Sequence, residues 1–387
     1  MSRLRVVHAA KFYPPSRGGM ETVIADLCNG TSADWDVRVI AANENAKTLR
    51  ERVGNVDVLR AAAFGSAASV PLCPSYPNHL WRQPADCVVL HEPNPLAGAA
   101  LFVRNPARRL VVWHHSDLLR PWWAPHTYGH LQRALYRRAA CVIVSSPNLA
   151  RSSPLVQQAR KVIVIPFGVQ LERFRLLTPE QRELAEHLKQ TVAGPRVLFV
   201  GRFVYYKGVE FLVDAMAHSA GTLILAGEGP LEGALRARVS AQGMDGRVMF
   251  AGRVSDEELP AYYHAADVFV LPSVAKTEAF GVVQVEAMAA GVPVVSTSLN
   301  TGVPWVNQHN VSGLVVEPGS ADALTQALNY LATGPDLRAR LARGAAARAG
   351  ELFSVEKMIA TFKRVVEQAV HSPHALADGR RVGVEMS

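Results

Sequence analysis

The sequence predicts an α/β protein with two doubly wound parallel sheets, and three observations support this fold class. The 387 residues exceed what one ordinary hydrophobic core accommodates, so two domains are expected. Short runs of Val, Ile and Leu alternate with helix-like stretches, and the runs are continuous, which is typical of parallel strands covered on both faces. The series of runs starts again near residue 196, which indicates a second sheet.

The first series of runs predicts an N-terminal domain over residues 1–169. A strand at 4–10 leads through the turn SRGGM into a helix at 18–30, where apolar residues recur every three or four positions. The remaining strands are expected at 36–42, 87–93, 109–115, 141–146 and 161–168.

The second series predicts a C-terminal domain over residues 170–353. It begins after a polar, linker-like segment from Gly168 to Pro195, and its first helix is expected at 208–219. A last helix at 354–371 precedes an aperiodic tail, 372–387, that is expected to be mobile. The strands of this domain are expected at 196–202, 221–230, 248–254, 266–273, 292–297 and 312–319.

Composition argues against several classes of protein. No run reaches the roughly 18–20 apolar residues that cross a bilayer, and the first residues lack the long apolar stretch and cleavage site of a signal peptide. We therefore expect a cytoplasmic protein. The four cysteines are scattered without a CxxC pair, which indicates reduced thiols rather than a disulfide or zinc framework.

Positive charge is concentrated in the first half of the chain. Residues 1–169 contain 20 Lys/Arg and 10 Asp/Glu, whereas residues 170–387 contain 21 and 23. This asymmetry predicts an anionic partner, such as membrane lipid, a phosphate-bearing acceptor or nucleic acid, although arginines that only confer solubility would give the same count. Because the sequence has no RNP, KH or zinc-finger signature, nucleic acid is not expected.

Two strand-to-helix turns carry candidate phosphate-binding groups. In GRFVYYKG, Arg202 and Lys207 flank a short loop that leads into a helix. An arginine fork and a lysine charge beside a helix N-terminus suit a diphosphate. In SRGGM, Gly18 and Gly19 would let backbone N–H groups approach a phosphate or a sugar, although a plain tight turn would look the same. The absence of GxGxxG argues against a dinucleotide fingerprint.

The segment KTEAFGVVQVEAMAAG places two carboxylates in an otherwise apolar stretch. Glu278 is expected in a loop, and Glu286 inside a helix that starts near Phe280. The sequence shows no internal partner for either carboxylate, and burial without one costs several kcal/mol. Ligand hydroxyls would offset this cost, while the first turn of the helix would offer unpaired N–H groups to a phosphate. Pairing with arginine or backbone groups is the structural alternative.

A histidine pair ends the strand expected at 109–115. His114 and His115 could lie near a reacting sugar, and paired histidines also suggest a metal site, but no further ligands follow at suitable spacing. The DxD pattern formed by Asp34 and Asp36 precedes a predicted strand, on the wrong side of a sheet for a ligand, so we interpret it as a coincidence.

Two more turns of the second domain, GEGP and GRVSDEEL, follow strands and are expected to border the base and ribose of a nucleotide. Val254 lies in the second of them. Asp256 either accepts hydrogen bonds from a base edge or starts a helix, and the pattern SDEEL favours the helix start.

Taken in order, these motifs resemble the retaining glycosyltransferases of family 4 over roughly residues 4–370. The resemblance implies the GT-B fold, in which two Rossmann-like doubly wound domains face each other across a cleft and the terminal helix crosses back to the first domain. HHSDLLRP and NTGVPWVNQHNVSGLVV are most similar to bacterial mannosyl- and related transferases that build polysaccharide or O-antigen on a lipid carrier.

The resemblance also implies roles for the candidate residues. Glu278 would position the transferred sugar, Glu286 would bind the ribose, and His115, or His114 if the register differs by one, would lie beside the sugar. The diphosphate would be held by Arg202, Lys207, Gly18 and Gly19. The remaining donor-binding residues would be Val254, Phe280, Gly281 and Val282.

The activity implied is transfer of mannose from GDP-mannose to a lipid-linked saccharide, with retained anomeric configuration and without a metal or cofactor. A UDP-sugar with another acceptor is the second candidate. A sugar-nucleotide epimerase shares the two-lobe fold but is disfavoured by the E-x7-E segment. A lectin-like binder is disfavoured because all four charged site residues are present: Arg202, Lys207, Glu278 and Glu286.

The segment 120–140 suggests a peripheral contact with anionic membrane. It places Trp122, Trp123 and Tyr128 beside three arginines, and interfacial aromatics with cations suit a lipid surface. An ordinary surface helix with partly buried aromatics would have the same composition. The three arginines are Arg133, Arg137 and Arg138.

Overall fold

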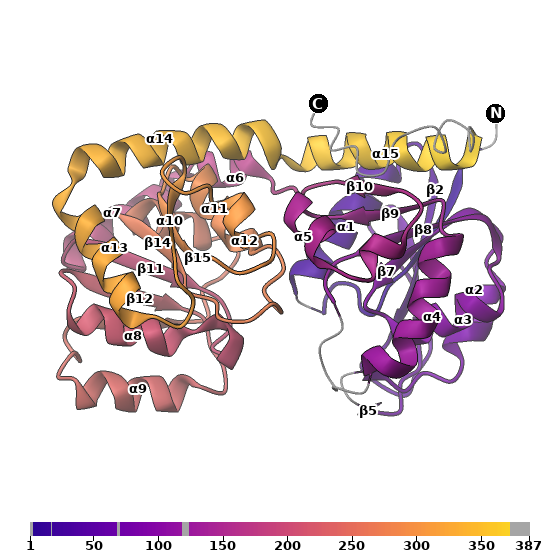
Figure 1. Cartoon of the computed structure of the whole chain (residues 1–387), viewed down its shortest axis with the longest axis horizontal. Coiled ribbons are helices and arrows are strands. Elements are labelled where there is room, and N and C mark those ends of the chain that lie inside the picture. The colour runs from indigo at the N-terminus through magenta and orange to yellow at the C-terminus, as the bar shows by residue number, and fades with distance from the viewer. Residues whose placement is uncertain (1–2, 17, 68–69, 118–123, 372–387) are drawn as a thin grey trace. The chain divides into compact units, whose positions relative to one another are not determined.

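The computed structural model describes residues 3–16, 18–67, 70–117 and 124–371. The chain divides into two compact units. Unit 1 comprises the residues up to Gly168 together with those from Val355 onward, and unit 2 comprises Val169–Ser354. Figure 1 shows that each unit contains a sheet flanked by helices. Within the described residues, no helix is long and apolar enough to cross a membrane.

Unit 1 contains an eight-stranded sheet with the order β10-β9-β8-β7-β1-β2-β4-β3. All neighbouring strands are parallel except β3, which is antiparallel to β4. The strands are β1 (Arg5–Ala9), β2 (Asp36–Ala42), β3 (Leu49–Val53), β4 (Val56–Ala61), β7 (Ala85–Glu92), β8 (Ala107–His114), β9 (Cys141–Val144) and β10 (Val162–Val164), with a short separate hairpin of β5 (Ser66–Ala67) and β6 (Val70–Pro71).

The β3–β4 hairpin was not predicted from the sequence. β3 is the edge strand, and its residues LRERV are exposed or half-buried. A charged edge strand lacks the continuous apolar run by which the buried strands were recognised.

Helices cover both faces of the sheet of unit 1. α15 contacts α1, β7 and β8 on one face, whereas α3 packs between α2 and α4 on the other. The core on that second face includes Leu90, Val112, Leu101 and Tyr136. The helices are α1 (Gly19–Thr31), α2 (Tyr76–Trp81), α3 (Pro95–Val103), α4 (Ala124–Arg138), α5 (Pro147–Ser152) and α15 (Val355–His371).

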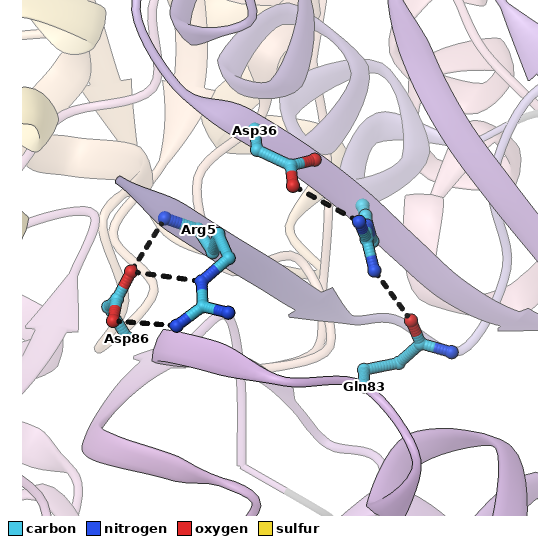
Figure 2. Close-up of polar contacts among 5 residues, drawn as sticks. Arg5, Asp36, Gln83 and Asp86 are labelled. Atoms are coloured by element: carbon cyan, nitrogen blue, oxygen red, sulfur yellow. Dashed lines mark hydrogen bonds and ion pairs between the residues drawn. The ribbon is translucent and has the colours of Figure 1, made fainter. Parts of the chain in front are cut away.

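Polar side-chain contacts connect the amino ends of strands in this sheet (Figure 2). The backbone N–H of Arg5 donates to Asp86 over 3.0 Å, and its guanidinium reaches the same carboxylate at 3.4 Å, so the starts of β1 and β7 are joined. Arg38 bridges Asp36 at 3.1 Å and Gln83 at 3.3 Å. These side chains lie at the edge opposite to the one where doubly wound sheets bind ligands.

Unit 2 contains a six-stranded parallel sheet with the order β13-β12-β11-β14-β15-β16. Its strands are β11 (Arg196–Val200), β12 (Thr222–Ala226), β13 (Val248–Gly252), β14 (Val268–Leu271), β15 (Val294–Thr297) and β16 (Gly313–Val316). Its helices are α6 (Leu171–Arg175), α7 (Pro179–Thr191), α8 (Val209–Ala217), α9 (Glu232–Ala241), α10 (Leu259–Ala265), α11 (Val282–Ala289), α12 (Val303–Val306), α13 (Ala321–Thr333) and α14 (Pro335–Leu352).

The segment expected to be a linker is instead helical and belongs to unit 2. Thr178 and Gln181 form a capping box at the start of α7, and α7 packs against α10. Ala185 and Leu188 are the buried residues of α7. The buried positions are spaced as on one face of a helix, but most of the segment is polar or charged, which explains why a linker was predicted.

Candidate active site

Two loops of unit 2 are held together at the carboxyl ends of neighbouring strands. β11 and β14 are adjacent in the sheet, and the backbone N–H of Val274 donates to the carbonyl of Tyr206 over 2.8 Å. Gly208 has a φ of +62°, and a Cβ there would lie 2.3 Å from the carbonyl oxygen of Pro272. Only glycine fits this position, so the tight turn places the loop after β11 against the loop after β14.

This arrangement brings Lys207 and Glu278 together. Lys207 Nζ lies 2.5 Å from Glu278 Oε2, and the hydroxyl of Ser273 donates to the same oxygen over 3.1 Å. The lysine is 9% exposed and the glutamate 8%, so the ion pair is largely shielded from water. Arg202, on the same loop as Lys207, is exposed.

Glu286 also has a partner inside the protein. The hydroxyl of Tyr263, in α10, donates to Glu286 Oε2 over 2.7 Å. Burial raises the pKa of Glu286 above its ordinary value, and the hydrogen bond from Tyr263 opposes that shift. The expectation that both carboxylates lack internal partners is therefore wrong. Their partners come from other strands and helices of the unit, which chain spacing does not reveal.

The start of α11 offers backbone donors beside this ion pair. Its first N–H groups, those of Val282 and Val283, have no acceptor within the helix. Gly281 precedes them with a φ of +72°, and a Cβ there would lie 2.5 Å from Leu271 Cδ2. The Phe280 ring is buried and lies edge-on to Phe353, with centroids 5.9 Å apart. In this structure Phe280 therefore anchors the loop, while the helix start remains a candidate phosphate site.

Val254 is half-buried after β13, in the turn that leads to α10. The helix-start signal in SDEEL is correct, since α10 begins at Leu259. Its cap differs from the prediction, because Ser255 and Glu258 bond reciprocally over 3.1 and 3.2 Å. The backbone carbonyl of Asp256, rather than its carboxylate, accepts a hydrogen bond from Arg173.

In unit 1, the two glycines of the first turn differ in their surroundings. Gly19 begins α1, and a Cβ on it would meet no protein atom within 4 Å. A Cβ on Gly18 would lie 2.2 Å from Glu21 Oε2. Glu21 is 9% exposed, and burial raises the pKa of its carboxyl. A side chain at position 18 would therefore require the Glu21 carboxylate to move, whereas nothing in the described chain requires glycine at position 19.

His114 and His115 lie on opposite faces of the sheet of unit 1. His114 Nδ1 lies 2.8 Å from the hydroxyl of Tyr136, and its Nε2 is 3.4 Å from Asp117. His115 is 2% exposed, its Nε2 lies 3.0 Å from His91 Nδ1, and burial lowers its pKa to about 3. His115 is therefore a neutral imidazole at ordinary pH.

A cavity of about 420 Å³ opens at the carboxyl ends of β1, β2 and β4. Such a place is where doubly wound domains bind ligands. A second cavity, of about 470 Å³, lies at the amino edge near Arg38, Arg50 and Arg52. The lining of the 420 Å³ cavity mixes acceptors with one aromatic ring: Phe12, Ser16, Glu21, Asn43, Glu44, Ala63, Gly65, Ser66 and Pro71.

The structure also bears on the cysteines and on a possible metal site. All four cysteines are free and buried, as expected. Among the described residues, no group of three His, Cys, Asp or Glu side chains could hold a metal ion.

The hydroxyl of Tyr128 donates to the buried Glu92 over 2.6 Å, so this group points into the unit. The membrane contact itself stays a prediction. Trp122 and Trp123 lie outside the described residues. The three arginines lie on the same helix, α4, as Tyr128. Arg133 approaches His130 at 3.2 Å and Arg137 donates to Gln158 over 2.9 Å. Arg138 lies over the ring of Phe102.

Sequence reasoning missed Tyr263, Ser273 and the histidines that accompany His115. Tyr263 and Ser273 gave no signal, because their roles depend on neighbours from other elements. His8 and His91 did give one, since each is a polar residue inside a continuous apolar strand.

The sequence matches two family models. Residues 18–168 match the glycosyl transferase 4-like domain, and residues 180–348 match glycosyl transferases group 1. The O-antigen chain mannosyltransferase C of Escherichia coli is 31% identical over 92% of this chain and 96% of its own length. The D-rhamnosyltransferase WbpZ of Pseudomonas aeruginosa is 32% identical over 91% and 92% of the two chains.

Solved structures share the fold of the whole chain at lower identity. Sucrose-phosphate synthase from Thermosynechococcus elongatus is 23% identical with a TM-score of 0.78, covering 95% of this chain and 99% of its own. Anabaena HepE, solved in complex with UDP, is 21% identical with a TM-score of 0.77, and the match covers 94% of this chain and 100% of HepE.

Proposed function

This chain belongs to the glycosyltransferases of the group 1 and 4-like families, with the GT-B fold, and we propose that it transfers mannose from GDP-mannose to a lipid-linked saccharide in bacterial polysaccharide assembly. Its similarity to an O-antigen mannosyltransferase supports mannose as the transferred sugar. The GDP-mannose dependence of a mycobacterial phosphatidylinositol monomannoside mannosyltransferase, 28% identical over 89% of this chain, supports the donor. A UDP-sugar is the second candidate, because HepE was solved with UDP.

The observation that carries the proposal is the Lys207–Glu278 pair beside Arg202 and the start of α11. Two cationic side chains and free N–H groups suit a diphosphate, and the carboxylate suits sugar hydroxyls. On donor binding, Lys207 exchanges Glu278 for a phosphate oxygen, and Glu278 accepts hydrogen bonds from the sugar. Glu286, held by Tyr263, accepts from the ribose hydroxyls.

In the proposed reaction, the bond between the anomeric carbon and the diphosphate oxygen breaks as the acceptor oxygen approaches from the same face. The acceptor oxygen forms the new glycosidic bond, and its proton passes to the departing diphosphate oxygen. Negative charge develops on the departing diphosphate, where Arg202, Lys207 and the N–H groups of α11 stabilise it without a metal. No side chain is assigned as a nucleophile, so no glycosyl-enzyme is expected.

The proposal is tested by following release of GDP from GDP-mannose, and of UDP from UDP-glucose, with and without lipid-linked acceptor. Release that requires the acceptor, with an α-linked product seen by NMR, supports retaining transfer. Conversion of a sugar nucleotide to its epimer without an acceptor would instead show an epimerase. A glycosylated carboxylate found by mass spectrometry would contradict the absence of a covalent intermediate.

Replacing Gly19 tests the backbone contact from unit 1. Because a Cβ at Gly19 meets no protein atom within 4 Å, Gly19→Ala is expected to leave the melting temperature unchanged or slightly raised. If the Gly19 backbone approaches the donor closely, the added methyl group lowers kcat/KM by about tenfold, equivalent to about 1.4 kcal/mol.

Gly233→Ala is the matched control, since a Cβ there also meets nothing within 4 Å. It lies in α9, and its kinetics should equal those of the unmodified enzyme. Equal kinetics for Gly19→Ala would contradict the contact.

We further propose that the cavity of about 420 Å³ receives the acceptor saccharide. Glu44, which accepts a hydrogen bond from Ser16 over 2.7 Å, is placed to accept from sugar hydroxyls as well. Glu44→Ala should raise the KM for the acceptor several-fold, about 1 kcal/mol for one lost hydrogen bond, with the KM for the donor unchanged. If the KM values for acceptor and donor rose equally, or if neither rose, the acceptor would bind elsewhere.

A further inference from the structure

Three histidines from neighbouring strands form a continuous hydrogen-bonded chain inside unit 1. His8 lies on β1, His91 on β7 and His115 directly after β8. His8 Nδ1 is 2.9 Å from His91 Nε2, and His91 Nδ1 is 3.0 Å from His115 Nε2. The rings stack with centroids 5.2 and 5.3 Å apart, and none is more than 3% exposed.

The rings of this chain are neutral, since burial lowers the pKa of all three histidines. A neutral imidazole carries one N–H donor and one acceptor nitrogen. Because His91 uses both of its nitrogens, it donates to one neighbour and accepts from the other. The tautomers of the three rings are therefore coupled, and the chain has two arrangements of opposite direction.

The two arrangements differ in which end of the chain presents an N–H. In one, the terminal donor is His8 Nε2, and the His8 ring lies 5.8 Å from that of Phe362 in the core under α15. In the other, the terminal donor is His115 Nδ1, at the carboxyl end of β8. Both terminal nitrogens are buried and, within the described residues, neither has a hydrogen-bond partner.

The surroundings of the two ends decide between the arrangements when a ligand is present. Ligands of doubly wound domains bind beyond the carboxyl ends of the strands, and His115, directly after β8, is the end of the histidine chain on that side of the sheet. His8 Nε2, inside the core, is out of reach. A buried donor without a partner is costly, so a ligand oxygen at His115 favours the arrangement in which His115 donates.

We propose that His8 and His91 are positioning residues that fix His115 as an Nδ1–H donor to an oxygen of the bound ligand. The tautomer of a histidine is set by the hydrogen bond at its other nitrogen, and here His91 Nδ1–H donates to His115 Nε2 while His8 Nδ1–H donates to His91 Nε2. The identity of the ligand as a sugar nucleotide rests on the proposed function, whereas the tautomer of His115 does not.

The test uses the full chain labelled with ¹⁵N-histidine, in which long-range ¹H–¹⁵N NMR reports the protonated nitrogen of each ring, with His115→Gln to assign the signal. Spectra are recorded without ligand and with GDP-mannose or UDP-glucose. With the sugar nucleotide that binds, His115 is expected in the Nδ1–H form. In the spectra without ligand, where no ligand oxygen favours Nδ1–H, His91→Leu removes the donor to His115 Nε2 and should raise the fraction of His115 in the Nε2–H form. His91→Gln, which can still donate and accept, should restore Nδ1–H.

Activity provides the second readout. His91→Leu should lower kcat by about tenfold or more, the range for partners that orient a functional histidine, with the KM for the donor changed less, and His91→Gln should recover most of kcat. Should His91→Leu fail to fold, His8→Leu interrupts the chain one step further away and replaces it in both measurements.

The proposal is overturned if His115 is Nε2–H in the unmodified protein with bound nucleotide. It is overturned equally if, without ligand, the tautomer of His115 is the same in the interrupted variant as in the unmodified protein. It is also overturned if the tautomer changes while kcat does not. Since the NMR readout needs no turnover, a protein that transfers no sugar would still show the coupled tautomers, which separates failure of this inference from failure of the proposed function.

Discussion

Lys207→Met is expected to lower kcat by 10²–10³-fold, roughly the effect of removing one preorganised donor that stabilises developing negative charge. The same change leaves the carboxylate of Glu278, 8% exposed, without its counter-ion. Breaking a buried pair from one side costs about 3–5 kcal/mol, so the melting temperature should also fall markedly. Loss of activity in this variant alone would therefore not separate catalysis from stability.

The double variant Lys207→Met/Glu278→Gln makes that separation. Replacing both members of a buried pair by neutral groups of similar size is often nearly neutral for stability, so most of the lost unfolding free energy should return. Activity should not, because the charge that stabilises the diphosphate is still missing. Thermal unfolding and single-turnover rates measure the two quantities independently.

The exposed pair of Lys189 and Glu186, 2.9 Å apart, is the matched control. Lys189→Met/Glu186→Gln should change the unfolding free energy by less than about 1 kcal/mol, as is usual for surface pairs, and should leave kcat unchanged. If the double variant at Lys207 and Glu278 regained activity together with stability, the assignment of Lys207 to the diphosphate would be wrong.

Acid is expected to destabilise unit 1 through its buried histidines. His8 and His115 have folded-state pKa values of about 3, well below the unfolded value of about 6.5. The unfolded chain therefore binds protons that the folded chain does not. The stability contributed by each neutral histidine is complete above about pH 6.5 and declines as the pH falls toward the folded value, by about 1.4 kcal/mol per pH unit for each ring.

His8→Gln isolates one ring of this effect. Glutamine still offers an N–H to His91 but does not titrate, so the slope of unfolding free energy against pH between 6 and 4.5 should be smaller by about 1.4 kcal/mol per unit. The comparison with the unmodified protein removes the contribution of Glu92, whose pKa burial raises and whose titration acts in the opposite direction. Urea unfolding at several pH values gives both slopes, and equal slopes would show that His8 is not protonated on unfolding in this range.

The sequence was most informative where a segment is buried on both faces. β2 spans Asp36–Ala42, as predicted, because its continuous apolar run has one physical explanation. β3 was not predicted because a charged edge strand has no continuous apolar run. α7 was not predicted because its few buried positions lie in a segment that is mostly polar.

The candidate site also contains features that local sequence predicts and features that depend on contacts between distant segments. Local features placed Lys207 at the end of one loop and Glu278 in another, because each follows a strand directly. Their contact could not be predicted, since β12 and β13 intervene in the chain between β11 and β14, although β11 and β14 are neighbours in the sheet. The partnership of Glu286 with Tyr263 likewise depends on how α10 and α11 pack, which neither segment encodes alone.

The ion pair between Lys207 and Glu278 also bears on how the proposed catalytic cycle ends. A nucleoside diphosphate that takes Lys207 leaves the carboxylate without a partner, whereas an intact sugar donor supplies hydroxyls for it. Once the sugar has moved to the acceptor, Glu278 competes with the remaining diphosphate for the lysine. The ion pair would thus lower the affinity for the nucleoside diphosphate product and favour its replacement by a new sugar-nucleotide donor.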